Sequence, residues 1–255
     1  MIGTSKTKPA AEQECSAPVG GGAGPDLAVA AKGLLFSHQG GAFMPALEAL
    51  DFTLERGGLL CLAGINGSGK STLLALLAGL YACRAERFMV LGHNMAADEA
   101  ERRKGAAKTA LLMQDPDAQI LGATVEEDLL LGLEASRLNL ERARDLARRL
   151  GLERLMDLPC QHLSHGQKRK LCLASALMRQ ADLLLLDEPF SGLDYPAIKE
   201  LRAIIGLLKR SGRSLVVGTH DLEPLLDMAE ELLVLSTDGR NVFGPPEEVL
   251  PKAAR

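Results

Sequence analysis

Short apolar runs recur along the chain, and each is followed directly by polar residues. Four of them cover residues 59–63, 110–113, 183–186 and 215–217. Continuous apolar runs of this length are typical of strands that are buried on both faces of a sheet. Helical patterns lie between the runs, and this alternation predicts a parallel α/β sheet. The polar residues then fall at the carboxyl ends of the strands, where open α/β sheets bind their ligands.

The middle third of the chain has a different pattern. Between Thr124 and Arg179 the sequence predicts helices and no strand, which indicates a helical insertion into the sheet domain. Within it, Asn139 is predicted to cap a helix, because asparagine is a favoured N-cap and an amphipathic pattern follows it. The apolar face of that helix is expected to hold Leu140, Ala143, Leu146, Ala147 and Leu150.

The two ends of the chain complete the outline. Residues 1–26 are rich in proline, glycine, alanine and lysine without periodicity, which predicts a disordered tail. Residues 27–255 are expected to form the folded domain. Near the C-terminal end, residues 232–235 and 240–243 flank Asp238 and Gly239, and this pattern predicts a β-hairpin.

Composition narrows the class of protein. The chain has 255 residues, is 47% hydrophobic and 24% charged, and has a formal net charge of -4, values typical of a soluble globular protein. This charge and the few aromatic residues give no reason to expect a nucleic-acid partner.

The five cysteines include no C-x-x-C pair, which favours reduced thiols in a cytoplasm-like compartment over a zinc site. The richest apolar stretch, residues 73–83, is too short to span a membrane, so other chains would have to do so.

A phosphate-binding loop is predicted after the first of the four apolar runs. Residues 64–71, GINGSGKS, match the pattern G-x-x-x-x-G-K-[ST], and an apolar helix is expected from Thr72 to Leu80. Glycines let successive backbone N–H groups converge on phosphate oxygens, and the helix N-terminus adds partial positive charge. Lys70 is predicted to reach the β- and γ-phosphates, and the Ser71 hydroxyl to ligate Mg²⁺. The residues expected to contact the nucleotide are Asn66, Gly67, Ser68, Gly69, Lys70, Ser71 and Thr72.

Two acidic residues follow the apolar run at residues 183–186. A carboxylate directly after a buried strand is costly unless it is paired or holds a metal, so Asp187 is predicted to hold Mg²⁺. Glu188 points in a different direction from its neighbour and is predicted to act as general base on the attacking water. The plainer alternative is a surface turn before Pro189, and it loses weight beside a phosphate-binding loop.

A third motif links these elements to a family. Ser164 and Gln167 have the S-x-x-Q spacing of a capping box, which alone predicts only the start of a helix. Here, however, the motif lies between the phosphate-binding loop and the acidic pair. The ordered set of motifs resembles the nucleotide-binding subunits of ATP-binding-cassette (ABC) transporters over roughly residues 27–250. That set comprises residues 64–71, Gln114, residues 163–167, residues 183–188, residues 191–194 and His220.

The resemblance implies a fold and a reaction. The fold is α/β, with a P-loop NTPase (RecA-like) core, a largely parallel sheet and an antiparallel β subdomain. An α-helical subdomain is inserted at about residues 115–179, within an ATPase domain that covers residues 27–255. ATP and Mg²⁺ are the implied cofactors, and ATP hydrolysis is the implied activity.

The resemblance also implies a partner and a composite site. In this family two copies lie head to tail and sandwich two ATP molecules, so a second copy of the chain is the expected partner. Ser164, Gly166 and Gln167 match the positions that approach the γ-phosphate held by Lys70 of the other copy. His165 stands where most of the family has glycine, and its side chain would either add a donor or crowd the helix tip.

Further roles follow from the same resemblance. Gln114 would contact Mg²⁺ and the lytic water, and Asp194 would lie at the seam between the two copies. His220 would contact the γ-phosphate and help to orient the attack. His38 is the first choice for the residue that stacks on adenine, and Phe36 is the second.

One stretch points to a branch of the family. QDPDAQI, from Gln114 to Ile120, resembles the Q-N-P-D-x-Q stretch of the energy-coupling-factor importers. A transmembrane transporter subunit would dock near these residues, which would place the protein on the cytoplasmic face of the cell membrane. We expect such an importer to carry cobalt or nickel. The alternative is an ATPase for a vitamin such as biotin, or for another ABC transporter.

Two further classes of protein fit less well. A soluble ABC-type ATPase of DNA repair would carry a long coiled coil between phosphate loop and signature, and no sustained heptads occur here. A translation factor of this type would join two cassettes, and one is present. A nucleotide-binding regulator without activity would need Lys70 or Glu188 to be lost, and both are present.

Overall fold

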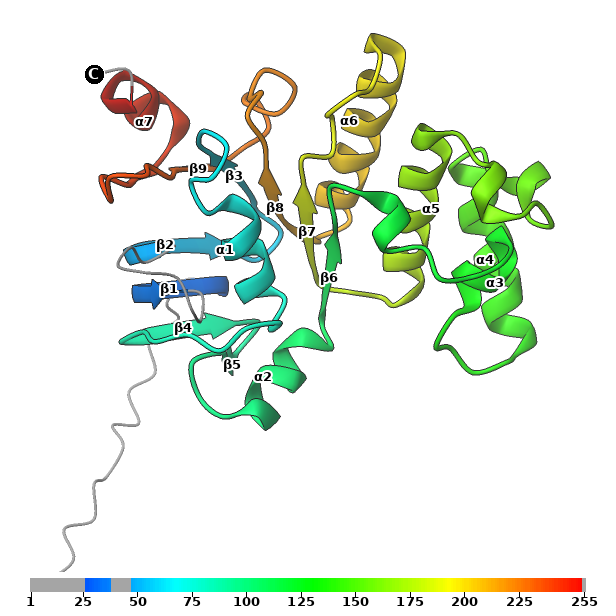
Figure 1. Cartoon of the computed structure of the whole chain (residues 1–255), viewed down its shortest axis with the longest axis horizontal. Helices are drawn as coiled ribbons and strands as arrows, with labels where there is room; N and C mark the ends of the chain where they lie inside the picture. Colours follow the sequence, from blue (N-terminus) through cyan, green and yellow to red (C-terminus); the bar gives the residue numbers. More distant parts are fainter. Residues whose placement is uncertain (1–25, 38–46, 254–255) are drawn as a thin grey trace, which may run out of the picture.

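The structure is a computed structural model that describes residues 26–37 and 47–253. Figure 1 shows a sheet-rich half and a group of helices, α3, α4 and α5, that lie together beyond strands β6 and β7. The predicted tail, apart from Asp26, lies outside the described residues, and so does His38.

The larger sheet has six strands in the order β10-β9-β3-β8-β7-β6. Its strands are β3 (Leu59–Ala63), β6 (Thr109–Leu112), β7 (Leu183–Asp187), β8 (Ser214–Gly218), β9 (Glu231–Val234) and β10 (Val242–Gly244). All neighbouring pairs are parallel except β9 and β10, which form an antiparallel pair. The four predicted core strands and the C-terminal hairpin are therefore confirmed.

The smaller sheet is antiparallel, with the order β2-β1-β4-β5. Its strands are β1 (Leu27–Phe36), β2 (Leu47–Glu55), β4 (Arg87–Val90) and β5 (His93–Asn94). The two sheets and the intervening helices agree with the expected α/β class, with a largely parallel sheet and an antiparallel part.

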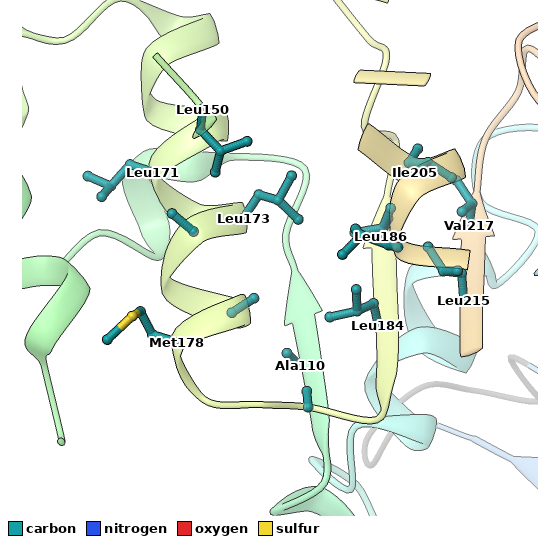
Figure 2. Close-up of a cluster of buried hydrophobic side chains, with 14 of the residues drawn as sticks. Ala110, Leu150, Leu171, Leu173, Met178, Leu184, Leu186, Ile205, Leu215 and Val217 are labelled. Atoms are coloured by element: carbon teal, nitrogen blue, oxygen red, sulfur yellow. The ribbon is translucent and has the colours of Figure 1, made fainter. Parts of the chain in front are cut away.

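Alternate side chains of the core strands enter two different apolar clusters. Leu60, Leu62, Leu183, Leu185 and Val216 pack with the antiparallel sheet and with helix α1 (Lys70–Leu77). Leu59, Cys61, Leu184, Leu186, Leu215 and Val217 enter the other cluster, with α5 (His165–Met178) and α6 (Tyr195–Arg210). Figure 2 shows part of this second cluster. Burial on both faces explains why these strands read as continuous apolar runs.

The remaining helices lie at the edges and in the inserted region. They are α2 (Glu99–Ala106), α3 (Val125–Leu130), α4 (Arg137–Arg149) and α7 (Pro246–Ala253), with 3-10 turns at Pro116–Ala118, Glu153–Leu155 and Cys160–His162. Between Thr124 and Arg179 the structure contains helices and turns and no strand, as the pattern predicted. Helix α1 ends at Leu77 rather than Leu80, because Gly79 adopts a left-handed conformation (φ 75°) that terminates it.

The predicted start of α4 was wrong. Ser136, not Asn139, is the N-cap, and its Oγ accepts a hydrogen bond from the Asn139 N–H at 3.2 Å. The Asn139 side chain instead donates to the Glu134 carbonyl at 2.9 Å, so it closes the preceding turn. Serine and asparagine are comparable N-caps, so local preference did not decide between them. The predicted apolar face is confirmed for Ala143, Ala147 and Leu150, which are buried, and for Leu146, which packs against the same core. Leu140, the fifth predicted residue, is only half-buried and lies outside that cluster.

Candidate functional site

The loop between β3 and α1 has the backbone geometry of a phosphate cradle. Gly67 and Gly69 both have positive φ, at 84° and 100°, and no side chain caps the N-terminus of α1. The first N–H groups of a helix have no partner within it, so the end of α1 is suited to an anion. Gly64 is required at the start of the loop, because an added Cβ would meet Ser68 Oγ at 2.4 Å and the Leu235 carbonyl at 2.6 Å.

Lys70 is buried at the centre of this loop. Its Nζ donates to the carbonyl oxygens of Gly64 at 2.6 Å and Ile65 at 3.3 Å. The same atom lies 3.6 Å from Oε1 of Glu188, whose side chain is also buried. The ammonium group is therefore held inside the cradle by two carbonyls and one carboxylate.

Glu188 is held by a strained backbone at the carboxyl end of β7. Its φ of 47° is uncommon for a residue other than glycine, and such strain is typical of functional positions. The Glu188 N–H donates to the Gly218 carbonyl at 2.8 Å, which joins it to the end of β8. Its Oε2 lies 2.7 Å from Nδ1 of His220, so two predicted catalytic residues form a direct contact.

Asp187 has the features of a ligand for a hard cation. Its Oδ1 is buried and has no hydrogen-bond partner. Burial raises the pKa of this carboxyl, the Glu188 carboxylate raises it as well, and the Ser71 hydroxyl and Lys70 act in the opposite direction. An orphaned carboxylate oxygen beside a serine hydroxyl provides oxygen ligands of the kind that Mg²⁺ takes, so these residues fit that ion.

One cleft of about 700 Å³ gathers most of the predicted residues. It is lined by Ile65, Asn66, Gly67, Gly69, Lys70, Ser71, Thr72, Gln114, Asp187, Glu188, Ser191 and His220. Ser68 belongs to the same loop but is buried and does not line the cleft, and its Oγ has no hydrogen-bond partner. Ser191 lines the cleft without a predicted role of its own, although it belongs to the motif at residues 191–194 and its side chain is polar.

The other predicted residues lie elsewhere in the chain. Ser164 caps α5 with the predicted reciprocal capping box: its N–H donates to Gln167 Oε1 at 2.8 Å, and Gln167 N–H donates to Ser164 Oγ at 3.3 Å. Ser164 and His165 are exposed at this helix tip. Asp194 caps α6 by accepting from the Ala197 N–H at 3.0 Å. None of these residues lines the cleft of the same chain.

His38, the first choice for the adenine contact, lies outside the described residues. Phe36, the second choice, stacks on Tyr81 with 5.5 Å between ring centroids.

The loop after β6 is held by two residues without a predicted role. The Gln119 side chain donates to the Leu111 carbonyl at 2.9 Å and accepts from the Met113 N–H at 3.0 Å, as a strand partner would. Asp128, which is buried, accepts from the N–H groups of Leu121 and Gly122 at 2.9 and 3.0 Å. The segment from Gln114 to Ile120 is therefore anchored at its carboxyl-terminal end.

Comparison with known proteins identifies the family. A family profile described as ABC transporter matches residues 47–191. The chain belongs to the ABC transporter ATP-binding family. It is 34% identical over 235 residues to the nickel import ATP-binding protein NikO of Rhodobacter capsulatus, covering 88% of this chain and 91% of that protein. It is 32% identical over 229 residues to the energy-coupling factor transporter ATP-binding protein EcfA of Carboxydothermus hydrogenoformans, covering 88% and 83%.

The fold of this ABC ATPase agrees with solved structures. CbiO1 of Clostridium perfringens, described as part of the ABC transporter complex cbiONQ, aligns with a TM-score of 0.78 and 26% identity. The alignment covers 89% of this chain and 92% of that one. The expected P-loop NTPase fold and the resemblance to energy-coupling-factor ATPases are confirmed, and the protein is an ATPase of this family. In the described part of the chain, no helix is long and apolar enough to cross a membrane.

Proposed function

We propose that this protein is the ATP-hydrolysing subunit of a membrane importer of the energy-coupling-factor type. The observation that carries the proposal is the contact between Glu188 and His220 at the mouth of a phosphate-binding cleft. A base, a histidine, a lysine and a free helix N-terminus then face one volume large enough for a nucleotide's phosphates. This set of groups serves phosphoryl transfer to water.

The chain's own residues divide the reaction between them. The N–H groups of residues 66–72 would bind the β- and γ-phosphates, and Lys70 would exchange its carbonyl partners for phosphate oxygens. Glu188 would accept a proton from the attacking water as its oxygen bonds to the γ-phosphorus and the bond to ADP breaks. His220 would keep the Glu188 carboxylate oriented and contact the γ-phosphate. Ser71, Gln114 and Asp187 would hold Mg²⁺, which would neutralise phosphate charge.

The exposed tip of α5 supports a site shared between two copies. Ser164 and His165 are exposed and do not line the chain's own cleft, so this helix N-terminus is open to an anion from outside the chain. A head-to-tail homodimer would place it over the γ-phosphate in the partner's cleft, with Asp194 at the seam. ATP would then close the dimer and hydrolysis would reopen it, because ADP forfeits the contacts that the γ-phosphate makes with both copies.

An apolar groove beside the anchored loop supports docking of a transmembrane subunit. Leu80, Met113, Leu121 and Leu131 are exposed large hydrophobic residues, and all four line this groove of about 370 Å³. Leu121 is the most exposed of them at 75%. We assign the groove to a short amphipathic helix of a membrane subunit, since it adjoins Gln119 and the loop that leads to Gln114. Such docking would hold the protein at the cytoplasmic face of the membrane.

Cobalt or nickel is the proposed cargo. The relative named for nickel import matches over 91% of its length, which supports a transition metal. A vitamin precursor is the second candidate, because a putative HMP/thiamine import ATP-binding protein of Bacillus subtilis is 34% identical over 201 residues, although the match covers 36% of that protein. Uptake of labelled cobalt, nickel, thiamine and biotin by cells with and without this chain separates the candidates.

A Glu188→Gln variant tests the proposed reaction and the dimer together. The amide keeps the shape of the side chain but cannot accept the proton, so turnover should fall by about 10²–10⁴-fold while nucleotide binding persists. Size-exclusion chromatography should show a dimer that requires ATP. Glu200→Gln on the surface of α6 is the matched control and should behave as wild type. Unchanged turnover in Glu188→Gln would rule out the assigned base.

Co-purification tests the docking surface. A Leu121→Asp variant should no longer purify with a membrane protein extracted in detergent, because the charge would have to enter an apolar contact. Leu138→Asp is the control, since Leu138 is similarly exposed, at 66%, but does not line the groove. If neither the wild type nor the control captures a membrane protein, the soluble ABC-type ATPase becomes the better hypothesis.

A further inference from the structure

Helix α5 begins with a charge pattern that its own local structure disfavours. Lys168, Arg169 and Lys170 follow directly after the capping box, and the first turn contains no acidic residue. The N-terminus of a helix carries partial positive charge, so three consecutive cations there are unfavourable unless other elements compensate. Residues that are locally unfavourable, such as cations at a helix N-terminus, are expected at positions where function requires them.

Each of the three cations is compensated by a different element. Lys168 Nζ lies 2.5 Å from Asp117 Oδ1 in the 3-10 turn after β6, and Arg169 Nη1 donates to the Pro189 carbonyl after β7 at 2.5 Å. Lys170 Nζ lies 2.7 Å from Glu200 Oε1 on α6. The start of α5 is thus tied in three directions.

The Lys168 contact differs from the other two in what it joins. Asp117 belongs to the loop that begins at Gln114 in the nucleotide cleft and leads to the apolar groove. One turn further along α5, Cys172 Sγ contacts the Pro116 carbonyl at 3.9 Å, so the whole 3-10 turn lies against α5 (Figure 1). Gln119 fixes the other side of the turn to β6. A shift of this turn would therefore move the tip of α5.

Burial favours a defined geometry for this pair. The Lys168 side chain is only 15% exposed, whereas Asp117 is 61% exposed. Such a pair is partly open to water and adds little to the stability of the fold. Its effect is expected on the position of the helix tip rather than on folding, and the two effects can be measured separately.

We propose that Lys168 is a positioning residue, whose ion pair with Asp117 sets the α5 tip for the ATP bound in the partner copy's cleft. The proposal rests on the proposed homodimer and adds to it a specific link between the loop at Gln114 and the tip at Ser164. Lys168 does not line the cleft of its own chain, so it would not touch a nucleotide bound there.

The test uses the full chain carrying Glu188→Gln, in which the ATP-bound dimer accumulates. Lys168→Met keeps the aliphatic stem and removes the charge, and Asp117→Asn removes the other charge. Each should raise the ATP concentration for half-maximal dimerisation by about tenfold, measured by light scattering. Binding of a fluorescent ATP analogue to the monomer and the melting temperature should be unchanged. Lys170→Met is the matched control on the same helix and should dimerise like the parent.

A charge-swapped variant separates positioning from general disruption. Asp117→Lys combined with Lys168→Asp restores the ion pair with the same total side-chain length. This variant should return the ATP concentration for half-maximal dimerisation to within about twofold of the parent's value. The positioning role is overturned if the swapped variant needs as much ATP for half-maximal dimerisation as the single variants do. It is also overturned if Lys168→Met and Lys170→Met need the same ATP concentration. Either result leaves the proposed dimer intact. A parent that forms no dimer with ATP overturns the proposed function and this inference together.

Discussion

Glu188 and His220 meet across the carboxyl ends of two neighbouring parallel strands, with Oε2 of the carboxylate 2.7 Å from Nδ1 of the imidazole. Asp187 is paired in register with Gly218, so the next residue of β7 faces the loop that follows β8. The His220 N–H also lies 3.4 Å from the same carboxylate oxygen. The pair is therefore set by strand register as well as by side-chain contact.

His220→Ala should slow ATP hydrolysis without loss of folding. Removing the imidazole frees the Glu188 carboxylate to turn, and we expect kcat to fall by about 100-fold or more. Steady-state phosphate release measures it. A double His220→Ala, Glu188→Gln variant should be no slower than the slower single variant, because residues that act as a unit are not additive. His162→Ala, at an exposed position before α5, is the control. Additive losses would contradict joint action.

Gly64→Ala should destabilise the fold through a steric clash. The added Cβ would meet Ser68 Oγ and the Leu235 carbonyl at a φ of 151°, so we expect a loss of about 3 kcal/mol in the free energy of unfolding. Gly92→Ala is the control, because Gly92 also has a positive φ, of 86°, but open space around its Cβ position. It should lose about 1 kcal/mol. Urea denaturation compares the two, and equal losses would show that the clash is relieved by the loop.

Asp128→Ala should loosen the loop that borders the apolar groove. The carboxylate accepts from Leu121, Gly122 and, at 2.9 Å, from the Ser175 hydroxyl, and three donors would lose their partner. We expect a loss of about 3 kcal/mol in stability and faster amide exchange at residues 121 and 122. Asp145→Ala removes only exposed ion pairs on α4 and should cost about 0.5 kcal/mol or less. Unchanged exchange at these two amides would exclude the anchoring role.

Asp187→Asn should stabilise the nucleotide-free protein at neutral pH while abolishing hydrolysis. Because burial raises the pKa of Asp187 in the folded state, the folded protein holds this proton more tightly than the unfolded chain does. The associated stability is complete below the ordinary carboxyl pKa and is lost as pH rises through the raised value. Asparagine avoids this loss, so a gain of about 1 kcal/mol is expected at pH 7.

Melting temperatures measured at neutral pH and below the ordinary carboxyl range test the Asp187 prediction. The advantage of the variant should shrink toward zero in acid, since both side chains are then uncharged. A wild type that is more stable than the variant at neutral pH would show that Lys70 and Ser71 outweigh burial at this carboxylate.

The sequence by itself determined the core strands, the glycine-rich loop before α1 and the capping box of α5. Each of these features depends on residues that are close together along the chain. Buried strands need continuous apolar residues, and the loop needs glycines that accept positive φ. The capping box needs a serine and a glutamine three positions apart. Family resemblance added the order of the motifs.

Tertiary structure decided which side chains meet. Glu188 and His220 are 32 positions apart, and Lys168 and Asp117 are 51 apart, so strand register and helix packing bring them together. Tertiary structure also decided between residues with similar local preferences. At the start of α4, Ser136 rather than Asn139 is the N-cap. The propensities of residues for a helix or a cap position differ by less energy than tertiary packing provides. Propensities therefore predict where helices and strands form, but packing decides which side chains come into contact.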